Sequence, residues 1–462
     1  MKILVILLAV LGAAYSLVLN IVKYRSAGNP TPENLKDVYD AETYEKWKRY
    51  SAEHSRLEIA STLVSCIITV VLLSTNVYAA FASLFAPNSY LRNVIAVLLI
   101  EAMVDAVVGT AISYASTMVI EQKYGFNRST LKTFVIDRIR NLLIGLGFSL
   151  LLAVLMFFSH SWLGAWMIPL FTVVVFGFTV LINFLYPILS RVGNKFTPLE
   201  EGELKDALMA LLTKHGYQVK AIEVMDASRR TTKLNAYFTG FGKLKTIVLY
   251  DNLVNAMSPE EICAVFAHEL GHGLNKDIPK RFGLSFVNFL LMGTLAWGIC
   301  SIPEIYTAFG FAEVNYGFAY LVMTVCLGIL QPLISLVTNA QSRHAEYLAD
   351  RQAVIEGYGR EMISAFKKLA RDNFSHLSPS PINVVLEYSH PPLDRRVAEV
   401  EKAMAELGAA PKEDAEEQSS EPETTAVAEP EVEAVNDDMT DVLPEAEAAA
   451  EEPEATDESP AE

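Results

Sequence analysis

The run AHELGH at residues 267–272 contains two histidines four residues apart. On an α-helix, residues at positions i and i+4 lie on one face, so His268 and His272 can bind the same metal ion. Glu269 lies beside them and can reach a water molecule on that ion without being a ligand. The pattern is typical of zinc sites in which two histidines hold the metal and a glutamate acts as the general base.

The residues before this motif are typical of a helix start. Ser258 is a favourable N-cap, Pro259 suits the first helical position, and Glu261 can complete a capping box with Ser258. Apolar side chains follow at helical spacing, at Ile262, Val265 and Phe266. The sequence therefore predicts that the motif lies on a helix. The alternative is a buried helix that carries two histidines by chance.

A catalytic zinc site needs a third protein ligand, and the best candidate lies in residues 342–350. This segment continues an apolar run without a helix breaker, so we expect it to be helical. Glu346 and Asp350 share a face at i and i+4. Glu346 can then be the ligand, while Asp350 accepts a hydrogen bond from a ligand histidine. The alternative is a surface carboxylate pair beside two arginines; His344 is a competing ligand, but on another face.

The charge of the chain is divided unevenly. The 462 residues are 52% hydrophobic and carry a formal net charge of −17. Residues 411–462 contain 20 acidic side chains and one lysine, so the preceding 410 residues have a net charge of +2. No basic region with interleaved aromatic residues is present, so we do not expect nucleic-acid binding. The tail from residue 408 is predicted to be a disordered, solvated segment, with binding of an unknown partner as the alternative.

Seven apolar runs are long enough to cross a bilayer. They cover residues 3–22, 57–85, 94–119, 142–158, 163–189, 282–302 and 316–340. The first run could be a cleavable signal peptide, but Lys23, Tyr24 and Arg25 follow it directly and no clean cleavage site precedes them. We therefore predict that this helix is retained.

Basic residues indicate the orientation of these spans. The segments 23–56 and 121–140 carry seven and five Lys or Arg residues, whereas the loops expected on the opposite side carry only Arg92. The basic side of a membrane protein is normally cytoplasmic. The metal motif and the C-terminus are then cytoplasmic as well. Segment 23–56 itself is predicted to form a loop and an amphipathic helix.

The runs also predict the domain organisation of a mainly α, polytopic membrane protein. Residues 191–281 and 341–407 would form the two parts of a small α+β catalytic domain, and the tail 408–462 would follow. Residues 1–190 would be a membrane region of five spans, and 282–340 a membrane hairpin. In the first catalytic part we expect a helix at 200–215 and strands at 218–224, 233–238 and 246–250.

Two spans separate His272 from Glu346, so a shared metal must lie close to the membrane and face into the helix bundle. The third run contains Glu101 and Asp105 one turn apart. Ionisable groups within spans are costly and usually face a hydrated interior. Two interpretations remain open: a pair satisfied by neighbouring helices, or a water-filled cavity between the spans. Asn183 in the fifth run adds slight weight to a polar interior.

Several further motifs together resemble the type I CAAX prenyl endopeptidases, which are membrane-embedded gluzincin proteases. Besides HExxH at 268–272, they are SRxxExxxD at 342–350, EQKYGFN at 121–127, NKFTPL at 194–199, NAYFTG at 235–240 and SHPPL at 389–393. The resemblance covers about residues 1 to 405 and includes Arg396, six positions after His390. Arg395 departs from the family pattern, as do Val192 and Gly193, and the tail has no counterpart.

This resemblance implies a chamber of seven helices with a zincin-like site for one Zn²⁺ that opens into it from the cytoplasmic side. It implies cleavage after a prenylated cysteine, which removes the C-terminal tripeptide of a lipidated protein or peptide. His390 would stabilise the oxyanion, and Asn235 would begin a strand that pairs with the substrate. Arg396 would bind the substrate carboxylate or a structural acid. Without the resemblance, His390 would be a loop histidine and Asn235 a turn residue.

Other functions remain as alternatives. A membrane quality-control metalloprotease with substrates that are not prenylated would usually have fewer spans. A metal transporter would need ligands within the spans. A non-catalytic scaffold would be expected to have lost Glu269, which is present. The membrane would be the inner membrane of a bacterium or an endoplasmic-reticulum-type membrane of a eukaryote.

Overall fold

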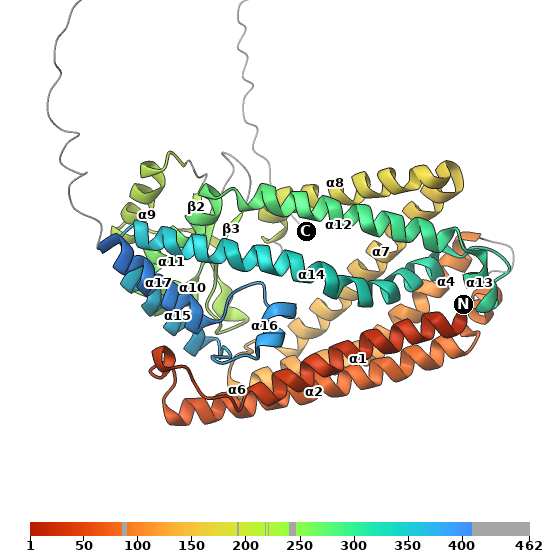
Figure 1. The fold of residues 1–462 in the computed structure, drawn as a ribbon, viewed down its shortest axis with the longest axis horizontal. Coiled ribbons are helices and arrows are strands. Elements are labelled where there is room, and N and C mark those ends of the chain that lie inside the picture. The colour runs from red at the N-terminus through yellow and green to blue at the C-terminus, as the bar shows by residue number, and fades with distance from the viewer. Residues whose placement is uncertain (86–89, 192–193, 218, 220, 240–245, 409–462) are drawn as a thin grey trace, which may run out of the picture. The chain divides into compact units, whose positions relative to one another are not determined.

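The membrane part of the chain consists of long helices, as its apolar runs predict. The computed structural model describes residues 1–85, 90–191, 194–217, 219, 221–239 and 246–408, all within one compact unit, Met1–Ala410 (Figure 1). The membrane part contains α1 (Lys2–Ser26), α2 (Ala41–Ser74), α3 (Val77–Phe85), α4 (Tyr90–Val104), α5 (Thr110–Tyr114), α6 (Gln122–Tyr124), α7 (Leu131–Leu163), α8 (Met167–Leu189), α12 (Asp277–Cys300) and α14 (Tyr316–Ile355). Short π-helical segments at Asp105–Gly109 and Ala115–Glu121 join α4, α5 and α6. The predicted acidic tail lies outside the described residues.

Six segments of the described chain are long and apolar enough to cross a membrane. One of them, Leu131–Leu189, contains the two helices α7 and α8, which are separated by a turn at Gly164 with φ +55°. Because α7 and α8 pack against each other, they count as separate helices. That seven helices span the bilayer stays a prediction.

The helix α2 differs from its prediction at both ends. Asp40 caps it by accepting a hydrogen bond from the backbone N–H of Thr43 at 2.7 Å. No glycine or proline interrupts residues 41–74, so the predicted amphipathic helix and the second apolar run form a single helix. The run predicted at 57–85 is not continuous, because the helix ends before Thr75 and the remainder forms α3.

The acidic pair in the third span contacts neighbouring helices. The hydroxyl of Tyr78 on α3 donates to Glu101, and Arg138 on α7 pairs with Asp105 at 2.6 Å. Both carboxylates also line a cavity of 210 Å³. The carboxylates are thus satisfied by neighbouring helices, as one interpretation holds, and they also border a cavity between the spans, as the other holds. Asn183 donates a hydrogen bond within its own helix and gives no support for a polar interior.

The soluble part contains one four-stranded sheet in the order β1-β2-β4-β3. Its strands are β1 (Phe196–Pro198), β2 (Ala221–Met225), β3 (Ala236–Thr239) and β4 (Thr246–Tyr250). Strands β2 and β4 are parallel, and the outer two are antiparallel to their neighbours. β4 has the predicted bounds, β1 was not predicted, and β3 begins later than predicted. Residues 218 and 220 of the strand predicted at 218–224 lie outside the described residues. The late start of β3 follows because Leu234 bonds to the side chain of Asn373 instead of a strand.

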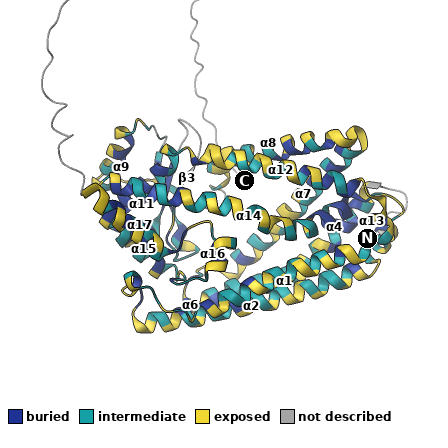
Figure 2. Cartoon of the chain, viewed as in Figure 1, coloured by how far each residue is buried: buried dark blue, intermediate teal, exposed yellow. Residues whose placement is uncertain are grey.

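Helices surround this sheet and fix the metal motif. They are α9 (Glu203–Lys214), α10 (Asp251–Ala256), α11 (Pro259–Leu274), α15 (Gly359–Asp372), α16 (Pro381–Glu387) and α17 (Leu393–Gly408), while α13 (Pro303–Ala308) lies in the membrane hairpin. The predicted capping box of Ser258 and Glu261 begins α11. One face of α11 packs with the sheet and α9, and another with α15 and α17, so most of its residues are buried (Figure 2).

Candidate metal centre and active-site cleft

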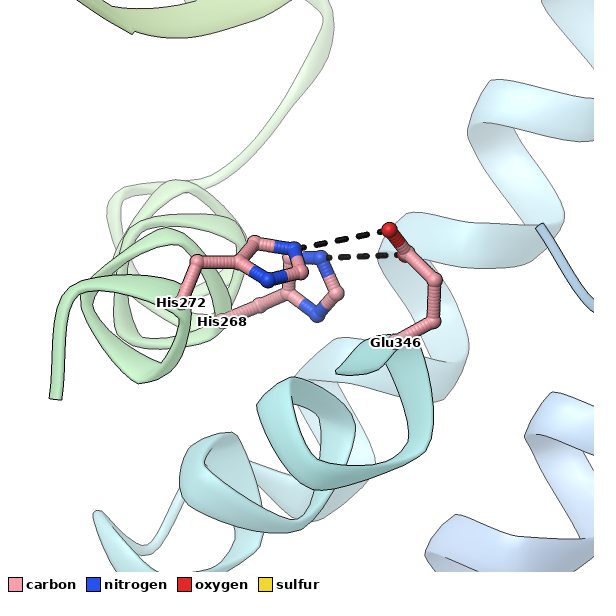
Figure 3. Close-up of side chains that lie close together, drawn as sticks. All are labelled: His268, His272 and Glu346. Atoms are coloured by element: carbon pink, nitrogen blue, oxygen red, sulfur yellow. Dashed lines mark ion pairs between the residues drawn. The ribbon is translucent and has the colours of Figure 1, made fainter. Parts of the chain in front are cut away.

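Three predicted ligands converge between α11 and α14 (Figure 3). The Nε2 atom of His268 lies 3.5 Å from Oε2 of Glu346, and the Nε2 atom of His272 lies 3.5 Å from Oε1. Tetrahedral zinc with bonds of 2.0–2.2 Å sets its ligand atoms about 3.4 Å apart. One carboxylate oxygen of Glu346 and one nitrogen of each histidine lie within 4.8 Å of one another, which is close enough for one zinc ion to bind all three and keep a fourth position open.

The chemistry of these donors also fits a metal ion. The Oε2 atom of Glu346 is buried and accepts no hydrogen bond from the described residues, although Nη2 of Arg396 lies 3.3 Å away. A buried carboxylate oxygen without a hydrogen bond is costly, and a bound metal ion would satisfy it directly. Two imidazoles and one carboxylate are a ligand set typical of catalytic zinc. His344, the competing candidate, is exposed and lies outside this group.

A second carboxylate holds each ligand histidine by its other nitrogen. Asp350 lies 2.8 Å from Nδ1 of His268, and Asp277 lies 2.9 Å from Nδ1 of His272. Burial pushes the pKa of His268 down, but hydrogen bonds to Asp350 and Glu346 outweigh it and raise that pKa from 6.5 to about 9. The pKa of His272 is also raised, because bonds to Glu346 and Asp277 outweigh burial. Without metal the site therefore binds protons, which a metal must displace.

Arg396 binds an acid of the protein itself. Its guanidinium donates to both oxygens of Asp350, from Nη2 at 2.6 Å and from Nε at 2.9 Å, and Nη2 lies 3.3 Å from Glu346. The side chain also packs over the ring of Phe366, with 4.2 Å to its centroid. Of the two roles left open by the sequence, this geometry favours the structural acid over the substrate carboxylate.

The motif glycine allows α11 and α14 to approach closely. A Cβ atom on Gly271 would lie 2.9 Å from the Cα of Ala349 and 2.9 Å from the Cβ of Gln352. Such contacts are too short, so any larger residue would push the two helices apart. Because His272 and Glu346 lie on these two helices, the glycine helps to set the distance between the ligands.

Two cavities meet at the ligands. The larger, of 560 Å³, is lined by Asn235, Glu269 and His390 among others, and the smaller, of 340 Å³, also reaches Glu269 and His390. Glu269 thus faces both cavities beside the donor atoms, without being one of them. Asn235 directly precedes β3, whose outer edge has no strand partner among the described residues. The larger cavity therefore borders a free strand edge.

His390 lies at the junction of these cavities. Its Nε2 atom is 3.3 Å from Glu346, and its Nδ1 atom is 2.9 Å from the hydroxyl of Ser389. The loop before it is held from α14, where Nη1 of Arg343 donates to the carbonyl oxygens of Val384 at 2.9 Å and Tyr388 at 2.8 Å. The imidazole therefore lies beside the donor atoms at a position fixed by another helix.

Two of these contributors were not predicted. Asp277 follows the second histidine by five residues and could have been noticed as an acid near a ligand. Its position depends on Lys276, whose φ of +55° makes a tight turn between α11 and α12. Arg343 belongs to a recognised motif, but its partners are backbone carbonyl groups of a distant segment. Every residue has such a group, so the sequence does not show which ones an arginine will bind.

Two protein families match consecutive parts of the chain. Residues 20–191 match the family described as CAAX prenyl protease N-terminal, five membrane helices, and residues 198–404 match peptidase family M48. A curated relative from Oryza sativa subsp. japonica, "CAAX prenyl protease 1 homolog", is 30% identical over 401 residues, which cover 83% of this chain and 93% of the relative. The chain belongs to the CAAX prenyl protease 1 family of the M48 peptidases.

Other members of the CAAX prenyl protease 1 family agree in extent and fold. The Saccharomyces cerevisiae "CAAX prenyl protease 1" is 30% identical, with 79% of this chain and 87% of the relative covered. The crystal structure of S. mikatae Ste24p superposes with a TM-score of 0.79 at 27% identity, covering 86% of this chain and 98% of that one. This CAAX prenyl protease 1 family member is therefore an integral membrane metalloendopeptidase.

Proposed function

We propose that this metalloendopeptidase uses Zn²⁺ to remove the C-terminal tripeptide from prenylated CAAX-type proteins or peptides. The observation that carries the proposal is the convergence of His268, His272 and Glu346 at zinc-ligand spacing, with Glu269 beside them in a cleft. The names of the relatives, which are CAAX prenyl proteases, support the substrate class.

Zinc, when bound by these three residues, supplies a Lewis acid that lowers the pKa of a water molecule and polarises the substrate carbonyl. Glu269 takes the proton from the attacking water and passes it to the leaving amine. Its position next to the ligands but outside their set suits this transfer. Asp350 and Asp277 keep the two histidines oriented, and Arg396 holds Asp350 in place.

His390 donates a hydrogen bond to the oxyanion that develops on the substrate carbonyl. Its place 3.3 Å from Glu346 puts the imidazole next to the reacting group. The substrate backbone adds to the free edge of β3 as an extended strand, and Asn235 contacts it at the start of that edge. Both residues line the 560 Å³ cavity.

The proposed active site lies close to the membrane. The helix α14 contributes both a candidate span and the ligand Glu346, so the site lies near the bilayer surface, where a lipidated chain end is presented. The charge bias of the loops supports a cytoplasmic position for the catalytic parts, 191–281 and 341–407, and for the C-terminus. A metal transporter is less consistent with the site, since the described residues offer one candidate metal group, outside the apolar part of the spans.

Cleavage of a farnesylated CAAX peptide by detergent-purified protein tests the proposal. We expect hydrolysis of the bond after the cysteine, identified by mass spectrometry. Activity should be lost with a zinc chelator, restored by zinc, and absent in Glu269→Gln. The same peptide without the farnesyl group is the control for lipid specificity. Equal cleavage of both peptides would favour the quality-control protease, and no cleavage of either would refute the prenyl-protease proposal.

A further inference from the structure

The smaller cavity contains a basic side chain that the chemistry described so far does not use. The cavity of 340 Å³ extends from the ligands His268, His272 and Glu346 to Arg281 and Ser342. Arg281 lies in the second turn of α12 and makes no ion pair with the described residues. Its one polar side-chain contact there is a hydrogen bond of 3.5 Å to the hydroxyl of Ser342.

Arg281 is exposed and directly precedes the apolar run 282–302 of α12, a candidate membrane span. At this end of the span its guanidinium can face water or a ligand at no cost of burial. Arg281 shares a helix face with Asp277 at i and i+4, and Asp277 contacts His272. The arginine therefore faces the metal centre, and its charge acts on His390 across the same cavity.

The distances suit the end of a cleaved peptide. A tripeptide in extended form spans about 10 Å from the scissile bond to its α-carboxylate. The Cα atom of Arg281 lies about 6 Å further along α12 than that of Asp277, and the arginine side chain extends this reach. The same cavity is also lined by Tyr217, Leu270 and Ile278, whose apolar groups suit aliphatic side chains.

We propose that Arg281, with Ser342, binds the free C-terminal carboxylate of the substrate and so selects peptides that end three residues after the cleaved bond. This inference rests on the proposed function and specifies the substrate group that its site recognises. The other nearby arginine, Arg396, already donates two hydrogen bonds to Asp350. Two N–H groups of a guanidinium can bind both oxygens of a carboxylate, and those of Arg281 are available for this contact.

The test compares two fluorescein-labelled farnesylated peptides that differ only in a C-terminal carboxylate or carboxamide. Their binding to zinc-loaded Glu269→Gln protein is measured by fluorescence anisotropy, and their kcat/KM is measured with the active enzyme. We expect the carboxylate to bind about 10- to 100-fold more tightly, as for a charge-assisted hydrogen-bond pair. Adding Arg281→Gln should collapse this ratio to near one, whereas Arg281→Lys should retain part of it.

Arg360→Gln is the matched control, since it removes an exposed arginine that lines neither cavity and should leave the ratio intact. Equal affinity for the two peptides, no binding of either, or a preference that survives Arg281→Gln would overturn the inference. Zinc content and the melting temperature of each variant exclude misfolding. If the active enzyme cleaves neither peptide, the proposed function fails, but the binding comparison still decides the role of Arg281.

Discussion

At the scale of single residues, two carboxylates outside the ligand set determine how the histidines present their Nε2 atoms. Asp350 and Asp277 accept from the Nδ1 atoms of His268 and His272, which fixes the tautomer that leaves Nε2 free for a metal. The two acids differ in support. Asp350 is held by the buried Arg396, whereas Asp277 lies in the first turn of α12 and pairs with the exposed Lys280 at 3.4 Å.

Replacing Asp277 should weaken the metal site without removing a ligand. We expect Asp277→Asn to reduce zinc affinity by about 10- to 100-fold. The neutral amide accepts a weaker hydrogen bond from Nδ1–H of His272 than the carboxylate does, so the imidazole becomes a poorer ligand. Competition with a calibrated chelator measures this affinity. Asp37→Asn, which breaks an exposed ion pair with Lys367, is the control. An unchanged zinc affinity would show that Asp277 only fills space.

A histidine outside the ligand set should make stability depend on pH. His376 packs against Trp47, with ring centroids 5.1 Å apart, and burial, followed by the charge of Lys23, lowers its pKa from 6.5 to about 4. Between these values the unfolded chain binds the proton more readily. Stability from this residue is therefore full above pH 6.5 and is lost as the pH falls towards 4.

His376→Gln should remove that dependence. Between pH 7 and pH 5 the wild type should lose about 2 kcal/mol of folding stability that the variant does not lose. Thermal melting in detergent at both values reports the difference as a larger drop in Tm for the wild type. Parallel drops in the two proteins would mean that His376 titrates normally when folded.

At the scale of elements, α14 connects the membrane to both sides of the site. It carries Glu346 and Asp350, packs against Gly271 of α11, and holds the end of α16 through Asn339 and Arg343. Arg343 and Asp350 are seven residues apart on α14. The first holds the loop of His390, and the second orients the ligand His268. This explains how a single helix sets the relative placement of groups from distant parts of the sequence.

Replacing Arg343 should therefore displace His390 while leaving the metal in place. We expect Arg343→Met to lower kcat by about 10- to 100-fold, as for loss of an oxyanion donor, with little change in KM or zinc content. Arg343→Lys should recover part of the loss. Steady-state kinetics and metal analysis on the same samples test this. Zinc loss in parallel with activity would instead indicate a general structural role.

At the scale of the whole molecule, the sequence predicted what depends on local spacing. The i, i+4 pairs His268–His272 and Glu346–Asp350, the capping box of α11 and the apolar runs could be recognised because each lies within one element. The free edge of β3 could not be recognised, because it depends on which distant strands pair with each other. The continuity of α2 could not be recognised either, because a second helix start within it was equally compatible with the sequence. The metal group itself could be proposed only by assuming that two separate helices meet.

The family resemblance ends before the acidic tail, since the matched residues end at 404. We expect removal of residues 411–462 to leave kcat/KM and Tm within experimental error of the full chain, because the described ligands and cavities lie before residue 409. Kinetic assays and thermal melting of the truncated protein in detergent test this. A large loss of activity would assign the tail a catalytic or substrate-binding role.

The central claim is that His268, His272 and Glu346 hold the catalytic zinc, and metal analysis of purified protein tests it most directly. Zinc per chain would be measured by inductively coupled plasma mass spectrometry for the wild type, Glu269→Gln and Glu346→Ala. The proposed site predicts about one zinc in the first two proteins and little in the third. A full complement of zinc in folded Glu346→Ala, or none in the active wild type, would contradict it.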